Sequence, residues 1–136
     1  MKKKKKPKLK SLSSLKKKAW VLFSQYIRTK AMDNGGHCIC YTCGDHSHWK
    51  EMQAGHAIPG RHNAVLYDEE VVRVQCVRCN IFLRGNYPIF TTKLIKAHGM
   101  EWWEDKLANS RKTVKYTRTD IQEIIDKYTE RLKSYG

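Results

Sequence analysis

The stretch that decides the fold runs from residue 55 to residue 86. It reads, in order, Gly-His-Ala-Ile-Pro-Gly at 55–60, Asp-Glu-Glu at 68–70, Cys-Val-Arg-Cys-Asn at 76–80 and Gly-Asn at 85–86. A second Cys-x-x-Cys lies upstream, at residues 40–43. The pattern predicts a small unit clamped by a metal ion, in which His56 and Asn80 face each other across the clamp.

Two matched cysteine pairs predict a structural zinc site. A thiolate pair separated by two residues can bind one tetrahedral zinc, and the 32 residues between the pairs leave room for an inserted hairpin. The predicted ligands are Cys40, Cys43, Cys76 and Cys79. We expect the fifth cysteine, Cys38, to be a free or buried thiol. The alternative is that Cys38 replaces Cys40 as a ligand. The nearby His46 and His48 are interpreted as loop residues that face solvent.

Length and cysteine content bound the class of protein. A chain of 136 residues and 16.0 kDa makes one domain with tails, and its modest core benefits from a metal staple. The odd count of five cysteines and the lack of a signal-peptide pattern argue against disulfides and favour metal thiolates. No apolar run is long enough to span a bilayer, so we expect a cytoplasmic protein with no membrane partner.

The positive charge is concentrated at the amino terminus. The net charge is +14, and the first 18 residues hold ten lysines and no acid, which leaves 14 − 10 = +4 for the rest. A lysine run repels itself, so residues 1–11 are expected to form a disordered tail that binds a polyphosphate chain by displacing its counterions. A solubilising tail without a specific partner is the alternative.

The fold class predicted from these segments is α+β. Apolar residues at three- and four-residue steps predict a helix over 12–34, which Ser13 or Ser14 caps and the turn residues at 33–36 end. The zinc-bound core is expected over 37–86. Residues 87–136 are predicted to be helical.

Within the core, two short segments are predicted to pair as antiparallel strands. They cover 51–58 and 71–75 and are joined by a loop over 59–70, and a helix is expected from Asn80 to Arg84. This is the ββα-metal arrangement, flanked by one helix before it and helices after it. In the last helix Thr119 and Gln122 are expected to form a capping box, and its apolar stripe either packs on the first helix or pairs with another subunit.

These residues resemble a known family. Cys-x-x-Cys-Gly, then Gly-His with a proline three residues on, then Cys-x-x-Cys-Asn resembles the HNH nuclease pattern. The longer match is to the NinG/Rap recombination endonucleases of lambdoid phages, and it rests on Ala54-Gly55-His56, Asn63-Ala64, Tyr67-Asp68-Glu69 and Gln75-Cys76-Val77-x-Cys79-Asn80 with Gly85-Asn86. The resemblance implies a DNA endonuclease for branched recombination intermediates, including four-way (Holliday) junctions. It also implies a structural zinc, a catalytic divalent metal and, for a phage protein, the host cytoplasm.

The chemistry of phosphodiester hydrolysis assigns roles to two residues. It needs a deprotonated water in line with the leaving oxygen and a cation to absorb charge on the phosphate. His56 suits the first role as general base, because imidazole titrates near neutrality. Asn80 suits the second, because its amide oxygen follows a zinc-bound cysteine and is an appropriate ligand for Mg²⁺ or Mn²⁺.

The second ligand of the catalytic metal is an open question in the sequence. Many HNH enzymes carry an aspartate or histidine before the catalytic histidine, but here that residue is Gly55, and Val71 stands where the middle asparagine is expected. We expect Asp68 to fold back toward His56 as that ligand. The next candidates are Glu69, His62 and Asn63. A role for His56 as metal ligand, not base, also stays open.

Basic residues near these sites are candidate DNA contacts. They are Arg61, Arg73, Arg78, Arg84, Lys16, Lys17 and Lys18. A four-way junction is cut by two symmetric nicks, so a homodimer suits that substrate. The alternatives are an HNH nicking or double-strand endonuclease indifferent to branching, and a zinc module that binds DNA without cutting it.

Overall fold

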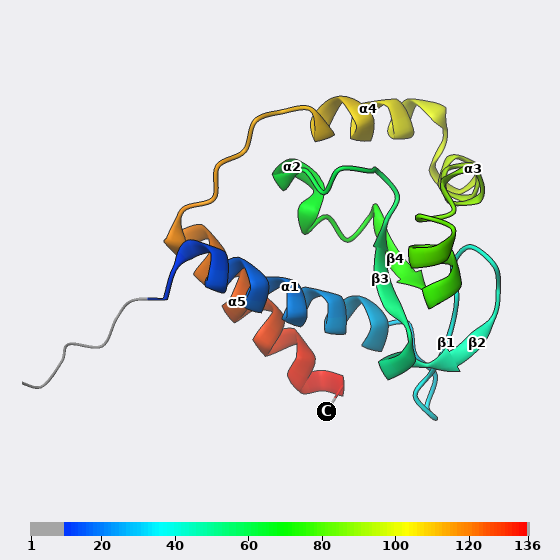
Figure 1. Ribbon diagram of the computed structural model, residues 1–136, viewed down its shortest axis with the longest axis horizontal. Helices are drawn as coiled ribbons and strands as arrows, with labels where there is room; N and C mark the ends of the chain where they lie inside the picture. Colours follow the sequence, from blue (N-terminus) through cyan, green and yellow to red (C-terminus); the bar gives the residue numbers. More distant parts are fainter. Residues whose placement is uncertain (1–9, 136) are drawn as a thin grey trace, which may run out of the picture.

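The computed structural model describes residues 10–135, in which helices surround two small antiparallel sheets (Figure 1). The helices and strands are α1 (Leu12–Thr29), β1 (His37–Ile39), β2 (His46–His48), β3 (Gln53–His56), α2 (Asn63–Leu66), β4 (Val72–Gln75), α3 (Tyr87–His98), α4 (Met100–Ser110) and α5 (Arg118–Leu132). Three short turns complete them: η1 (Trp49–Glu51), η2 (Arg78–Phe82) and η3 (Lys133–Tyr135). The predicted α+β class is confirmed. Most of the predicted tail lies outside the described residues.

Helix α1 is shorter than the predicted range. Its N-cap is Ser11, whose hydroxyl accepts a hydrogen bond from the amide of Ser14 at 3.1 Å, so the cap precedes both predicted serines. The helix ends at Thr29, and the carboxylate of Asp33 then accepts bonds from the amides of Gly35 and His37 at 2.9 Å each. The turn chemistry at 33–36 therefore starts the first hairpin, and it does not end the helix.

The predicted pairing of the two core strands is confirmed over a shorter length. Strand β3 pairs antiparallel with β4, with Gln53 opposite Gln75 and His56 opposite Val72. The hairpin of β1 and β2 was not predicted, and in it His46 and His48 lie in a strand and not in a loop. This hairpin carries the first cysteine pair at its tip.

Two predicted segments of the core differ in the structure. The loop over 59–70 contains the short helix α2. The helix expected from Asn80 to Arg84 is instead the single π-helical turn η2, in which the amide of Leu83 bonds the carbonyl of Arg78 at 2.8 Å. Gly85 then takes a positive φ of 99° and donates its amide to the carbonyl of Cys79, which closes the turn on the cysteine pair.

The carboxyl-terminal helices cover the core on two sides. Figure 1 shows α5 alongside α1 and α3 followed by α4 on the other side of the core. The predicted apolar stripe of α5 packs on α1, where Ile121 and Ile125 contact Ala19 and Tyr128 contacts Phe23. Its capping box uses Thr117 and Asp120, two residues earlier than the predicted Thr119 and Gln122. No described helix has the length and apolar character that a membrane crossing requires.

Candidate zinc site and active-site groove

Four cysteine thiols converge at the base of the β3–β4 pair. The Sγ atoms of Cys40, Cys43, Cys76 and Cys79 all lie within 4.8 Å of one another, and those of Cys43 and Cys76 are 3.6 Å apart. Tetrahedral zinc with bonds of ~2.3 Å places its sulfur ligands ~3.8 Å apart, so the cluster could hold a structural zinc. The predicted ligand set is brought together as a whole.

Cys38 is separate from this cluster. Its thiol is buried and donates to the carbonyl of Arg28 at 3.2 Å. Burial raises the pKa of this thiol above its usual range, which makes it an inert core residue. The choice between Cys38 and Cys40 as ligand is therefore settled in favour of Cys40.

Burial and hydrogen bonds shift the pKa values of three thiols in this cluster. Burial raises the pKa of Cys43 to about 12 and raises that of Cys76 as well. Burial opposes ionisation of Cys40 too, yet hydrogen bonds from Thr42 and neighbouring amides lower its pKa to about 6. A bound cation would balance the charge of the thiolates that a zinc site requires.

His56 lies in a groove of about 560 Å³ that Asn80 also lines. Its ring stacks on the indole of Trp20, with centroids 5.0 Å apart and planes inclined by 19°. Its Nε2 lies 3.1 Å from the carbonyl oxygen of Leu66. A carbonyl only accepts, so Nε2 carries the proton and Nδ1 is left as the acceptor. Burial, with a smaller contribution from the nearby Arg61, lowers the pKa of His56, so the ring is neutral at neutral pH.

Asn80 is oriented by one strong hydrogen bond. Its Nδ2 donates to Oε1 of Gln53 at 2.7 Å, which leaves its Oδ1 without this partner. The free Oδ1 lies 3.1 Å from the point that a Cβ on Gly55 would occupy. Because η2 begins between the two cysteines of the second pair, this oxygen is held at a fixed distance from the zinc site.

A second amide oxygen points to the same place. Gln75 is fully buried, and its Nε2 donates to Thr42 Oγ1 and to the carbonyl of Gly85, both at 3.0 Å. Its Oε1 has no donor among the described residues and lies 1.8 Å from the Cβ position of Gly55. Any side chain at residue 55 would collide with it, which is why glycine stands before His56.

These two oxygens are candidate ligands for a hard divalent cation. Mg²⁺ and Mn²⁺ take neutral amide oxygens together with water and phosphate oxygens. Gln75 Oε1 is a buried acceptor without a donor, and such atoms are costly unless something binds them.

Comparison with known proteins adds one finding. A family model described as the bacteriophage lambda NinG protein matches residues 1–135. The chain belongs to the NinG family. No curated protein and no solved structure matches it.

In this NinG-family chain the predicted acidic ligand lies away from the groove. Asp68 Oδ2 accepts a hydrogen bond from Lys106 of α4 at 2.8 Å, and Asp68 Oδ1 accepts one from the amide of Glu70. Glu69 is bound by Arg131 at 2.7 Å and by Tyr128, both from α5. The acidic triplet therefore fastens α4 and α5 to the core.

The other two candidate ligands, His62 and Asn63, also lie away from Asn80. Asn63 Oδ1 accepts from Lys16 at 3.0 Å, and Asn63 Nδ2 donates to the carbonyl of Val114 at 2.9 Å. His62 precedes α2 and does not line the groove that holds His56. Neither residue is placed with Asn80, because the loop that carries them turns back as α2.

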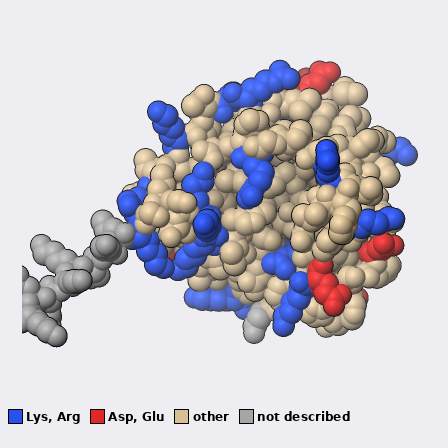
Figure 2. Space-filling model, in the orientation of Figure 1, with Lys and Arg blue, Asp and Glu red and all other residues tan. Residues whose placement is uncertain are grey.

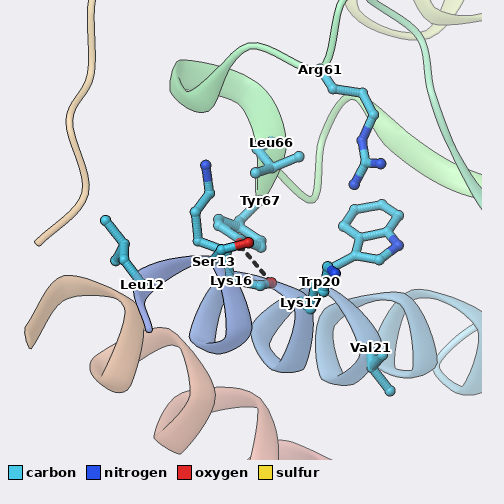
Figure 3. Close-up of a pocket in the computed structure, with 9 residues that line it drawn as sticks. All are labelled: Leu12, Ser13, Lys16, Lys17, Trp20, Val21, Arg61, Leu66 and Tyr67. Atoms are coloured by element: carbon cyan, nitrogen blue, oxygen red, sulfur yellow. Dashed lines mark hydrogen bonds between the residues drawn. The ribbon is translucent and has the colours of Figure 1, made fainter. Parts of the chain in front are cut away.

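Several predicted DNA contacts gather beside the groove. Lys16, Lys17 and Arg61 line a neighbouring cavity of about 780 Å³, and Trp20 and Arg61 line both spaces. Figure 3 shows the guanidinium of Arg61 directed at the indole of Trp20, at 4.6 Å from the ring centroid. Lys18 is exposed on α1 outside this cavity. Figure 2 shows lysine and arginine side chains gathered over the start of α1.

The three remaining arginines lie elsewhere. Arg73 donates to the carbonyl of Glu70 at 3.2 Å and lies over the ring of Tyr41, so it is a structural residue of β4. Arg78 and Arg84 are exposed at either end of η2. Arg78 also approaches the thiol of Cys43, which raises the pKa of its guanidinium.

Sequence reasoning missed Trp20, which lines the groove, and Gln75, which is buried beside Gly55. Trp20 was not singled out, because its partner His56 is distant in the chain and only tertiary packing joins them. Gln75 was quoted only as part of the family resemblance. A polar residue that ends the apolar strand Val72–Gln75 was the available signal, because such a residue is buried only when its polar groups have a use.

Proposed function

We propose that the chain is a metal-dependent DNA endonuclease that cleaves branched recombination intermediates such as four-way junctions, in the host cytoplasm. In this proposal β3, β4 and η2 form an HNH-like ββα-metal core on a structural zinc. The observation that carries it is the shared groove of His56 and Asn80, in which the histidine is neutral, oriented and free at Nδ1. Among the described residues that line this groove, none is acidic, which suits a phosphate chain.

The proposed reaction is hydrolysis at phosphorus. Nδ1 of His56 takes a proton from water as the water oxygen bonds to phosphorus, and the bond from phosphorus to the 3′ oxygen breaks. The 3′ oxygen leaves with a proton from solvent, so the products are a 5′ phosphate and a 3′ hydroxyl. Leu66 and Trp20 hold the ring in place during this transfer. Asn80 Oδ1 and Gln75 Oε1 would hold the Mg²⁺ or Mn²⁺, whose positive charge stabilises the phosphate and the departing oxygen.

Gln75 is expected to control affinity for Mn²⁺ in the absence of DNA. Changing Gln75 to glutamate keeps the oxygen and adds charge, so we expect Mn²⁺ to bind about tenfold more tightly, and Gln75→Met to bind it about tenfold more weakly. The measurement is Mn²⁺ binding by electron paramagnetic resonance on the zinc-loaded chain. Asp68→Asn is the matched control and is expected to change nothing. Equal Mn²⁺ affinities in the two Gln75 variants would show that Gln75 does not bind the metal.

The pH dependence of cleavage follows from the buried histidine. Because burial lowers the pKa of His56 below its ordinary 6.5, the single-turnover rate should reach half of its plateau below that pH and stay constant above it. Arg61 is the facing cation that contributes to this shift, and Arg28 and Tyr87 also line the groove. Arg61→Gln should move the half-point upward, whereas Arg84→Gln, with the same charge change, should not. A wild-type half-point above 6.5 would contradict the assignment.

The substrate class is tested with two DNAs of the same sequence. A labelled four-way junction and a linear duplex are incubated with the zinc-loaded chain and Mg²⁺ or Mn²⁺. Paired symmetric nicks in the junction alone are expected and would also support action as a homodimer. Equal cutting of both DNAs would identify a nuclease without branch preference. Tight, salt-sensitive binding without any product would leave a zinc module that only binds DNA.

A further inference from the structure

An apolar tip protrudes from the zinc-bound core beside the groove. It consists of Ile81, Phe82 and Leu83, whose exposed fractions are 54%, 76% and 47%. Phe82 is the most exposed large apolar side chain of the described residues. Three adjacent apolar side chains in water usually mark a surface that another molecule covers.

The tip has a rigid base. The amide of Asn80 donates to the carbonyl of Cys76 at 3.0 Å, and the amide of Gly85 donates to the carbonyl of Cys79 at 2.8 Å. Both ends of the turn are therefore bonded to the second cysteine pair. The π-helical bond between Leu83 and Arg78 closes the turn between these ends. The apolar side chains are therefore held outward and cannot fold back onto the core.

The charge around the tip indicates the kind of partner. Residues 71–100 contain no acid and five cations, and two of these cations, Arg78 and Arg84, flank the tip and are exposed. Neither forms an ion pair within the described part of the chain. Two copies meeting through this face would oppose cation to cation, and three side chains offer far less than the ~800 Å² that each partner of a stable complex contributes. DNA meets both requirements, because its phosphates can bind the two arginines and its stacked bases can cover the apolar side chains.

We propose that Phe82, supported by Ile81 and Leu83, inserts between base pairs of DNA while Arg78 and Arg84 hold the phosphates on either side. This inference rests on the proposed function and names how the same site selects its substrate. Apolar wedges of this kind partly unstack a base step. Ile81 also lines the groove that holds His56 and Asn80, so the unstacked step lies next to the phosphate that is cut. A branch point, where stacking is already interrupted, is the easiest place to enter.

The test measures unstacking without cleavage. The full zinc-loaded chain with His56→Ala is mixed with a four-way junction or a linear duplex that carries 2-aminopurine, a base whose fluorescence rises when it unstacks, beside the branch point or the matching step. We expect a rise with the junction and a smaller one with the duplex. Adding Phe82→Ala should abolish the rise and weaken junction binding by about tenfold.

A matched control separates the wedge from general apolar loss. Ile39→Ala removes a side chain of similar exposure, 56%, from β1, and should leave both the fluorescence rise and the affinity unchanged. Phe82→Leu keeps an apolar tip and should retain part of the rise. A fluorescence rise that is undiminished in Phe82→Ala would overturn the proposal. So would the finding that Phe82→Ala converts a dimer to monomers without changing the fluorescence, because the tip would then be a contact between two copies of the chain. Unstacking by a wild-type chain that fails to cut would support the wedge and refute the nuclease.

Discussion

Replacing His56 by alanine is expected to lower the single-turnover cleavage rate by about a thousandfold while DNA binding survives, because a positioned general base contributes about 10²–10⁴ in rate. The imidazole that is proposed to take the proton is then gone. Binding should survive because the substitution leaves the proposed DNA contacts Lys16, Lys17 and Arg61 in place. Rates and affinities are measured on the same labelled junction.

A second variant separates catalysis from structure at this position. His56→Gln keeps a side-chain amide that can donate to the carbonyl of Leu66, so the loop contact of the ring is preserved while the base is lost. We expect it to be as inactive as His56→Ala and as stable as the wild type. A His56→Gln chain that cuts at more than about a tenth of the wild-type rate would show that another group takes the proton.

Changing Cys79 to serine is expected to unfold the core at physiological temperature. Structural zinc contributes about 10–16 kcal/mol in zinc-finger peptides, which is as large as the whole stability of about 5–15 kcal/mol typical of a domain. Losing one of four thiolates weakens this contribution severely. It also loosens the turn that carries Asn80, because Cys79 Sγ belongs to the cysteine cluster and lies 3.6 Å from Asn86 Nδ2, at the far end of that turn. The readouts are zinc content and the thermal unfolding curve.

Cys38 provides the control for this experiment. It is as buried as Cys79, but its thiol bonds the carbonyl of Arg28 and lies outside the cluster. A serine hydroxyl can make the same bond, so Cys38→Ser should keep its zinc and lower Tm by only a few degrees, or about 1 kcal/mol. Equal loss of zinc in both variants would contradict the four-cysteine assignment.

The parts of the fold that were predicted correctly are those with strong local patterns. The two cysteine pairs have a spacing that only a few uses explain, and the apolar steps of α1 and the β-branched run of β4 follow from elementary periodicity. The hairpin of β1 and β2 was missed because its strands are three residues each and rich in histidine. The cysteine cluster at its tip joins it to a distant part of the chain, and strand propensities of the local sequence do not include such contacts.

The candidate site was predictable in its types of residue more than in its partners. His56 and Asn80 follow from the motif, and they do line one groove. The expected role of Asp68 depended on where a loop would turn, and the structure joins Asp68 to Lys106, 38 residues away. The position of Gln75 Oε1 beside Gly55 could not be predicted, because it depends on the packing of two strands and glycine has no side chain that would indicate a neighbour.

His56 and a divalent cation beside Asn80 are the groups that we propose cut DNA. The most direct test of this proposal is product formed from a labelled four-way junction by the zinc-loaded chain as Mn²⁺ is titrated, with wild type and His56→Gln side by side. We predict product that rises and saturates with Mn²⁺ for the wild type and is absent for the variant. No product from a wild-type chain that binds the junction, or equal product from both proteins, would contradict it.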